Sequence, residues 1–354
     1  MSLVFTKNAL ERDMKLAKQY AALNQQRDMF NVNQAKIQSQ YAHTLSDAQM
    51  AGNAALGKDF WYEIDRANIR AREQAKGIEI LNDLASVTTT LNVGKTAYGY
   101  RSGSNIAKDV SVSIDGHKPF SYDHTDGEFD ADPIPVFLSG FGANWRHVEA
   151  NRSVDYDLIA DSQEAKMIVH TERLVDYVLN GDANIVVDGY AAQGLTNHRN
   201  TKKIDLGASG ANIDLTTASP ADVLAFFTTG AFGTNAQNNR VGGYDVVWVS
   251  YAIWNNLRKL YASNGLQLTA MDQIVGFGTV REFRPTFALT GNEFLGYVRR
   301  RDVLTMPVGA ATGVTAVPRF LPQDNYNFQI LTVAGIQVRK QSGGLGGVVY
   351  GANL

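Results

Sequence analysis

The residues best suited to chemistry gather in one short acidic stretch. Carboxylates and imidazoles crowd positions 117 to 132, at His117, Asp123, His124, Asp126, Glu128, Asp130 and Asp132. Such side chains bind hard or borderline cations. The calcium-loop template does not fit, because placing Gly127 in its glycine position puts Tyr122 and Pro133 at the first and last ligand positions. Alternation along a strand would also point neighbouring side chains to opposite faces. We therefore interpret the stretch as a solvated acidic loop, which could face a basic patch on a neighbouring molecule.

Two basic clusters could meet such an acidic surface. One is Arg299-Arg300-Arg301, and the other places Lys202-Lys203 beside His198 and Arg199. Neither has aromatic residues interleaved with its charges, so neither is a stacking platform for nucleic-acid bases. The formal net charge of −2 also lacks the basic excess of a dedicated nucleic-acid binder. We expect these arginines and lysines to form ion pairs between subunits in preference to contacting nucleic acid directly.

The sequence contains no complete local motif for binding a cofactor or for catalysis. Gly276-Phe277-Gly278 is followed by Arg281 where a third glycine would stand, and no helix follows Gly343–Gly347. Neither can therefore place a helix N-terminus on a phosphate. The sequence contains no HExxH or GxSxG, and its six histidines are scattered. We expect no cofactor, no metal site and no enzyme, although a site assembled from distant residues of an α+β hydrolase stays open.

Composition favours a large folded chain that contacts other protein. The 354 residues can bury about 75% of the unfolded surface without help from metals or disulfides. The chain has no cysteine, which excludes disulfides, thiolate zinc sites and cysteine nucleophiles. Charged residues make up 19% of it, below the usual level of about 25%. No segment resembles a secretory signal or the roughly 20-residue apolar run of a membrane span, so we expect no membrane contact.

The elements that must position these residues begin with a polar arm. Asn8–Met50 lacks Gly and Pro and spaces its apolar side chains as weak helical stripes, which bury too little to form a core. A second, amphipathic helix includes Ile78, Leu81 and Leu84 and is interrupted near Gly77. From Val87 to Tyr100 the residues favour strands. A long two-stranded ribbon follows over Tyr100–Trp145, with a hairpin turn predicted at Asp115-Gly116. An isolated ribbon is marginal in water, so it must lie on other protein.

The strongest helix prediction covers Asp155–Gly181, where apolar residues recur at helical spacing and Gly181 supplies the C-terminal stop. At 1.5 Å per residue it would run roughly 40 Å. Beyond Ala218 we expect a compact α/β unit around a mixed sheet. Its predicted elements are a helix starting at Ser219-Pro220, a strand over Tyr244–Ser250, a helix over Ala252–Ser263, and strands over Ile274–Phe283, Phe294–Val298 and Phe328–Val338.

This order of parts resembles the major capsid proteins of tailed bacteriophages and the related encapsulins, over nearly the whole chain. Trp61-Tyr62-Glu63-Ile64-Asp65-Arg66 is similar to a Trp-x-x-Ile-Asp segment that precedes the ribbon in many of these shells. Thr96–Tyr100, with Tyr98 and Tyr100, is similar to the tyrosine-bearing strand that enters the extended loop. Asp188–Asn197 resembles a Gly-x-x-x-x-Gly-Leu-x-Asn turn after the long helix, through Gly189, Gly194, Leu195 and Asn197. Gly tolerates backbone that other residues resist, and Asn tolerates a left-handed turn.

The resemblance implies an α+β, Hong Kong 97-like capsid fold with an N-terminal arm, an extended β-ribbon loop, a peripheral domain built on a long spine helix, and an axial α/β domain. The expected boundaries are 1–50 for the arm, 51–95 for the first helix and the start of the peripheral domain, 96–147 for the ribbon, 148–217 for the peripheral domain, 218–325 for the axial domain and 326–354 for a returning C-terminal strand. The residues singled out for assembly are Trp61, Ile64, Asp65, Tyr98, Tyr100, Asp115, Gly116, Asp126, Glu128, Asp130, Gly189, Gly194, Leu195, Asn197, Arg299, Arg300 and Arg301.

The implied function is structural. Many copies would form hexamers and pentamers that close into an icosahedral shell around double-stranded DNA, with a scaffolding protein, a portal and a decoration protein as further partners. The expected location is the virion, after assembly in the host cytoplasm. Two alternatives stay open: an encapsulin-type compartment enclosing a cargo enzyme, and a phage-tail or adhesin-like module that forms rings or trimers.

Overall fold

The computed structural model describes residues 14–41, 76–103, 112, 114–115, 124, 127–152, 158–263, 266–341 and 343–354. The chain divides into two compact units, Met1–Ile69 and Arg70–Leu354. In the first unit the described residues form one helix, α2 (Met14–Tyr41), which confirms the helix predicted in the arm. Several of its apolar side chains are exposed: Met14, Tyr20, Met29 and Val32. Within the described ranges no helix is long and apolar enough to cross a membrane.

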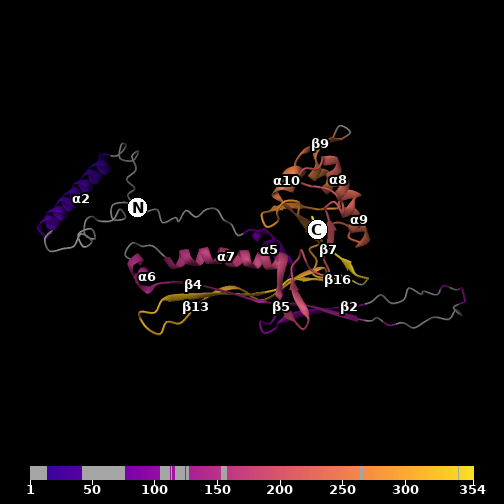
Figure 1. The fold of residues 1–354 in the computed structure, drawn as a ribbon, viewed down its shortest axis with the longest axis horizontal. Helices are drawn as coiled ribbons and strands as arrows, with labels where there is room; N and C mark the ends of the chain where they lie inside the picture. Colours follow the sequence, from indigo (N-terminus) through magenta and orange to yellow (C-terminus); the bar gives the residue numbers. More distant parts are fainter. Residues whose placement is uncertain are drawn as a thin grey trace. The chain divides into compact units, whose positions relative to one another are not determined.

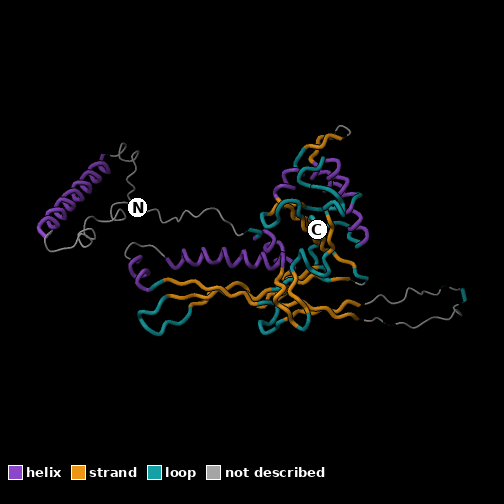
Figure 2. The backbone as a smooth tube through the Cα atoms, viewed as in Figure 1, coloured by secondary structure: helices purple, strands orange, loops and turns teal. Residues whose placement is uncertain are grey.

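A long, narrow sheet runs through the second unit (Figures 1 and 2). Its strands lie in the order β1 (Thr88–Thr90), β13 (Leu304–Ala316), β14 (Tyr326–Ala334) and β4 (Val136–Ala143). β1 is parallel to β13, the other pairs are antiparallel, and β15 (Gln337–Val338) pairs with the start of β13. β13 was not predicted from the sequence. Its Gly- and Thr-rich run lacks the continuous apolar pattern of a buried strand, and most of its second half is exposed.

The helix α7 (Leu158–Asn180) lies along β4 on one face of this sheet (Figure 1). It confirms the predicted spine helix and ends at Gly181, whose positive φ of 70° favours glycine. Leu174, Val175, Val178 and Leu179 are buried, as the periodicity predicts. Two shorter helices accompany it. They are α6 (Trp145–Arg152) and α5 (Ile78–Leu84). The latter begins directly after Gly77, near which an interruption was expected, and continues into a 3-10 turn, η1 (Ala85–Val87).

Two hairpins lie near the C-terminal end of α7. β2 (Ala97–Gly103) and β3 (Gly127–Pro133) pair antiparallel and form the base of the predicted ribbon. Ile114 and Asp115 form a bend where the turn was predicted, and Gly116 falls outside the described residues. The second hairpin joins β5 (Gly181–Val187) to β6 (Tyr190–Gln193). Its two loop residues, Asp188 and Gly189, have φ of 49° and 84°, as a type I′ turn requires.

The predicted mixed sheet is present in the remainder of the chain. Its order is β11 (Phe283–Thr286), β8 (Val246–Ser250), β12 (Phe294–Tyr297), β18 (Val348–Ala352) and β7 (Lys202–Asp205). The packed helices are α8 (Pro220–Thr228), α9 (Ala231–Asn238), α10 (Tyr251–Leu257) and α11 (Ala270–Phe277). Ser219 caps α8 as predicted, accepting a hydrogen bond from the Asp222 N–H. Every residue of β8 is buried.

Three predictions for this region are wrong. The strand expected over Phe328–Val338 in the mixed sheet is instead β14 and β15 of the long sheet. The helix expected over Ala252–Ser263 stops at Leu257, and Leu260–Ser263 is strand β9, paired with β10 (Leu266–Thr269). Of the strand expected over Ile274–Phe283, residues 274–277 are the end of helix α11, and strand β11 begins only at Phe283. Local signals explain the error at α11: the Thr269 side chain caps the helix, and Gly278 ends it with a φ of 77°. Two short strands, β16 (Lys340–Gln341) and β17 (Leu345–Gly346), form a further pair.

Two hydrophobic clusters meet at β8. Val246 and Trp248 point into one cluster, which includes the buried residues of α5 and α7. Val247 and Val249 point into the other, which includes Phe226, Phe227, Phe232 and Phe294. Because successive side chains of a strand point to opposite faces, this single strand joins the spine-helix core to the core of the mixed sheet.

Candidate functional site

The structure brings several sequence-predicted residues together at the base of the ribbon. We call the following group the ribbon-base cluster: Tyr100 on β2, Asp130 and Asp132 on β3, and His198, Arg199 and Asn200 in the turn that follows β6. The two aspartates come from the ribbon, whereas the other charged groups lie some 70 residues further along the chain. The cluster therefore fastens the extended loop to the end of the spine helix.

Arg199 is the central cation of the ribbon-base cluster. Its Nη2 lies 2.6 Å from an oxygen of Asp130 and 2.8 Å from one of Asp132, and it also donates to the Ala131 carbonyl at 2.9 Å. Its Nε donates to Asp130 at 3.1 Å. Burial opposes the charged form of Asp130, but the hydrogen bonds and charge of Arg199 outweigh it and hold the pKa of that carboxyl below its usual value.

Tyr100 and Asn200 complete the bonding of Asp130. The Tyr100 hydroxyl donates to Asp130 at 3.2 Å and accepts from the Lys340 N–H at 2.9 Å. The Asn200 amide nitrogen lies within hydrogen-bond distance of Asp130, of the Tyr100 hydroxyl and of the Val338 carbonyl. Burial, together with the negative charge of Asp130, raises the pKa of Tyr100 to about 12. The hydroxyl therefore keeps its proton and acts as a structural donor.

His198 holds the second aspartate. Its Nδ1 accepts a hydrogen bond from the Asn200 N–H at 3.1 Å, so the ring proton lies on Nε2, which donates to Asp132 at 3.1 Å. Both side chains are almost fully buried. This arrangement corrects two expectations. Asp130 and Asp132 do not belong to a solvated acidic loop, and His198 and Arg199 pair within their own chain.

The turn before His198 does not have the left-handed backbone expected at Asn197, whose φ is not positive, and Asn197 acts through hydrogen bonds instead. The Gly194 N–H donates to the Asn197 side chain at 2.8 Å, and the Asn197 amide donates to the Asn180 carbonyl at 2.7 Å. A Cβ at Gly194 would lie 2.2 Å from the carbonyl oxygen of Leu179, so a side chain there would displace the backbone. Leu195 is fully buried. Glycine, leucine and asparagine thus each have a separate physical role in docking this turn on α7.

The outer part of the ribbon base contacts the C-terminal strands. Glu128 pairs with Lys340 at 2.6 Å, and the Gln337 amide donates to the Tyr98 carbonyl at 2.6 Å. The Arg339 guanidinium lies 5.5 Å from the ring centres of both Tyr98 and Tyr100, within the range of a cation–π contact. Sequence reasoning missed these partners, because nothing local marks residues 337–340 as neighbours of the ribbon.

A second polar cluster ties α5 to the mixed sheet. Arg299 approaches both oxygens of Asp83, at 2.6 and 3.0 Å, and contacts Glu282 at 3.3 Å. The Tyr297 hydroxyl donates to Asp83 at 2.7 Å and accepts from the Trp248 ring N–H at 2.9 Å. The expected pairing of Arg299 between subunits is therefore replaced by pairing within the chain.

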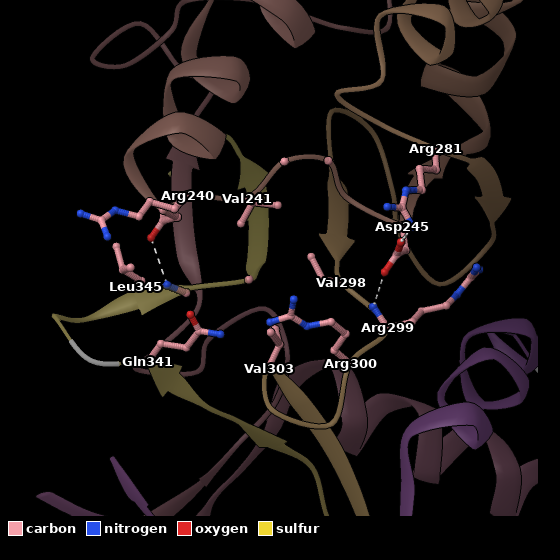
Figure 3. Close-up of a pocket in the computed structure, with 15 residues that line it drawn as sticks. Arg240, Val241, Asp245, Arg281, Val298, Arg299, Arg300, Val303, Gln341 and Leu345 are labelled. Atoms are coloured by element: carbon pink, nitrogen blue, oxygen red, sulfur yellow. Dashed lines mark hydrogen bonds and ion pairs between the residues drawn. The ribbon is translucent and has the colours of Figure 1, made fainter. Parts of the chain in front are cut away.

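A hollow of about 560 Å³ adjoins Arg299 and Arg300 (Figure 3). Asp245 lies between Arg281, 2.6 Å away, and the backbone N–H of Arg299, 2.7 Å away. Arg300 forms a two-point pair with Asp302. Arg281, Arg299 and Arg300 are thus paired, whereas Arg240, which also lines the hollow, forms no ion pair with the described residues. Arg301 is exposed and remains a candidate for contact with another molecule.

Trp61, Ile64, Asp65, Gly116 and Asp126 lie outside the described residues, and their expected roles stay predictions. Across the described ranges, no group of three or more His, Asp or Glu side chains is arranged to hold a metal ion. The two clusters above are ion pairs and hydrogen bonds that join distant segments of one chain. Their chemistry suits mechanical fastening, since their charged groups bind one another.

A family model described as "Family of unknown function (DUF6260)" matches residues 50–351. The chain belongs to the DUF6260 family. No curated protein matches this DUF6260 chain. Among solved structures, the capsid of Myoviridae phage XM1 is similar over 84% of this chain and 99% of that chain, with a TM-score of 0.59 and 15% identity.

Further structural neighbours of the DUF6260 chain come from other phages. A Microbacterium phage Oxtober96 chain is similar over 86% of this chain and 98% of that one, with a TM-score of 0.53 and 12% identity. A Mycobacterium phage Adephagia chain is similar over 87% of this chain and 97% of that one, with a TM-score of 0.52 and 10% identity. At such identities the likeness is one of fold, and the fold is the expected α+β, Hong Kong 97-like capsid fold.

Proposed function

We propose that this DUF6260 chain is a major capsid protein, which assembles through hexamers and pentamers into the icosahedral head shell of a tailed phage. The observation that carries the proposal is the extent of the structural likeness. It covers 99% of the chain from the phage XM1 capsid and 84% of this chain. Fold alone does not fix function, and the remaining support comes from the surfaces of this chain.

Those surfaces favour a building block over a catalyst. The ribbon-base cluster attaches the ribbon to the body, and among the described strands β2 and β3 of this ribbon pair only with each other. Extended elements of this kind gain burial when they lie on other copies, because an isolated two-stranded ribbon is marginal in water. Repeating one such contact by closed symmetry builds a shell from a single chain.

The proposed partners follow from this role. The main partner is the chain itself, with a scaffolding protein, a portal and a decoration protein as further partners. Packaged double-stranded DNA would touch the inner surface weakly and without sequence preference, in keeping with the net charge of −2. The proposed location is the virion, after assembly in the host cytoplasm.

The experiment that tests the proposal is to purify the particles that contain this chain from the cells that produce it naturally, treat them with nuclease and extract the protected contents. We expect particles of uniform size that protect double-stranded DNA of one length. Particles that instead protect a cargo enzyme and no DNA would favour the encapsulin-type alternative. Recovery of the chain only as rings or trimers would favour the tail-module alternative.

A further inference from the structure

The turn between β13 and β14 presents two large apolar side chains to solvent. Phe320 is 90% exposed and Leu321 is 54% exposed, the former among the highest values for any large apolar residue in the described ranges. We call this pair the hairpin knob. Monomeric proteins rarely expose large apolar side chains together without a partner, so the hairpin knob needs an explanation.

The turn that carries the hairpin knob is held rigid by its own polar groups. The Asp324 carboxylate accepts hydrogen bonds from the Phe320 and Leu321 N–H groups, at 3.0 and 2.8 Å. Arg319 donates to the carbonyls of Pro322 and Asp324, and its guanidinium lies 3.9 Å from the centre of the Tyr326 ring. Both charged side chains beside the knob, Arg319 and Asp324, are thus already occupied. Such a turn is preorganised to bury Phe320 and Leu321 with little further loss of conformational entropy.

The same chain has an apolar hollow suited to receive such a knob. The hollow has a volume of about 360 Å³ and lies where the start of β4 meets α7 and β5. Its apolar lining consists of Pro135, Val136, Phe137, Leu138, Val169 and Ile185. We call it the β4 groove. The charged side chains at its edge, Arg173 and Asp182, pair with each other at 3.0 Å, so the groove presents no unpaired charge there.

The hairpin knob cannot reach the β4 groove of its own chain. In the β4–β14 ladder, Tyr326 at the knob end pairs with Ala143, whereas Val136 at the groove end pairs with Val333. Seven residues of strand separate these positions, which is about 23 Å at the usual rise. Figure 1 shows the β13–β14 turn at the α6 end of the sheet and β5 at the opposite end of α7. A knob that fills this groove must therefore come from another molecule.

We propose that the hairpin knob of one copy inserts into the β4 groove of the next copy. The inference rests on the proposed function, because it assigns residues to the self-assembly described there. A contact between two different surfaces of one chain is heterologous, and such contacts build rings when the rotation closes. Phe320 is the anchor of the contact, and the exposed Val169, with Phe137 and Ile185 of the same groove, forms its receiving surface.

Removing the anchor should weaken assembly more than removing a similar side chain elsewhere. Burying a phenylalanine contributes about 1.5–3 kcal/mol, so Phe320→Ser should raise the protein concentration needed for assembly by about 10- to 100-fold. Phe277→Ser is the matched control, since Phe277 is also a phenylalanine, 67% exposed, on the distant helix α11. Equal effects of the two substitutions would overturn the proposal.

Cysteine crosslinking tests which surfaces meet. Because the chain has no native cysteine, every disulfide must involve an introduced residue. We expect assembled Phe320→Cys/Val169→Cys chains to form a ladder of disulfide-linked multimers on non-reducing gels. Either single variant should form none, and neither should the control pair Phe320→Cys/Val186→Cys, whose second position is exposed on β5 outside the groove. Ile185→Cys, which also lines the groove, provides a second partner position in case the first pair is misaligned.

Three other outcomes would count against the inference. Dimers from Phe320→Cys alone would show that knob meets knob, which overturns the groove as its site. Assembled shells without any crosslink at either groove position would overturn the contact while leaving the proposed function intact. If the parent chain forms neither capsomers nor shells under any condition, the proposed function fails first, and this contact falls with it.

Discussion

Replacing Arg199 by methionine should expose how strongly the ribbon-base cluster holds the ribbon. Methionine keeps much of the apolar length of the side chain but leaves Asp130 and Asp132 without their cation. The side chains of these aspartates are 10% and 3% exposed, so water cannot fully replace the arginine. Removing one partner of a buried ion pair costs about 3–5 kcal/mol. Because the Arg199 side chain is itself 29% exposed, we expect a loss of about 2–3 kcal/mol in the free energy of unfolding at pH 7.

The assay is urea unfolding of the unassembled chain, followed by tryptophan fluorescence at several pH values. The pKa of Asp130 is lowered in the folded protein, so the stability it contributes is present above its ordinary value of 3.8 and is lost as pH falls through the folded pKa. The deficit of Arg199→Met should therefore be largest near pH 7 and shrink below about pH 4. Adding Asp130→Asn to the variant should recover part of the deficit at pH 7, because one uncompensated charge is removed. A deficit below about 0.5 kcal/mol, the size expected of an exposed pair, or one independent of pH, would refute this reasoning.

Three further predictions concern the body and the arm. Gly194→Ala should lower the free energy of unfolding by about 2–3 kcal/mol, because its Cβ would collide with backbone. Gly276→Ala, in open space on a helix, should raise the free energy of unfolding by about 0.5–1 kcal/mol. Equal urea midpoints for the two variants would contradict this prediction. Burial, and then the charge of Lys166, lower the pKa of the His170 ring. The stability that His170 contributes is therefore present above the ordinary pKa of 6.5 and is lost as pH falls through the folded pKa. Between pH 7.5 and pH 5, the unfolding temperature should fall further for the parent than for His170→Gln. Deleting residues 1–50 should leave the urea midpoint of the body unchanged and abolish correct assembly, and normal shells in negative-stain micrographs of that truncation would refute the role of the arm.

The elements that the sequence predicted best are those whose signals are local. The spine helix follows from apolar residues at helical spacing and a glycine stop at Gly181, and the mixed sheet from the continuous apolar run around Val246–Ser250. Gly189, singled out because glycine tolerates backbone that other residues resist, has a φ of 84° between β5 and β6. In each case the responsible residues lie within a few positions of one another, so single-sequence reasoning can weigh them together.

The features that sequence reasoning missed depend mainly on residues far apart in the chain. Asp130 and Asp132 look like members of an exposed acidic run until Arg199 and His198, nearly 70 residues away, are placed beside them. The exposure of Phe320 in the hairpin knob could not be predicted either, because an apolar residue between two prolines gives no sign that it is exposed. Helix α11 was missed for a different reason: a short apolar run fits a strand or a helix equally well, and its cap and stop decide the outcome.

The mass and shape of the purified chain, from light scattering on a sizing column together with negative-stain microscopy, test the central claim most directly. We predict closed icosahedral particles, or hexamers and pentamers that convert into them. A scaffolding protein is supplied where the chain alone stays a monomer or dimer. A chain that remains a monomer or dimer at every concentration, with that scaffold present, would contradict the claim that this protein builds a shell.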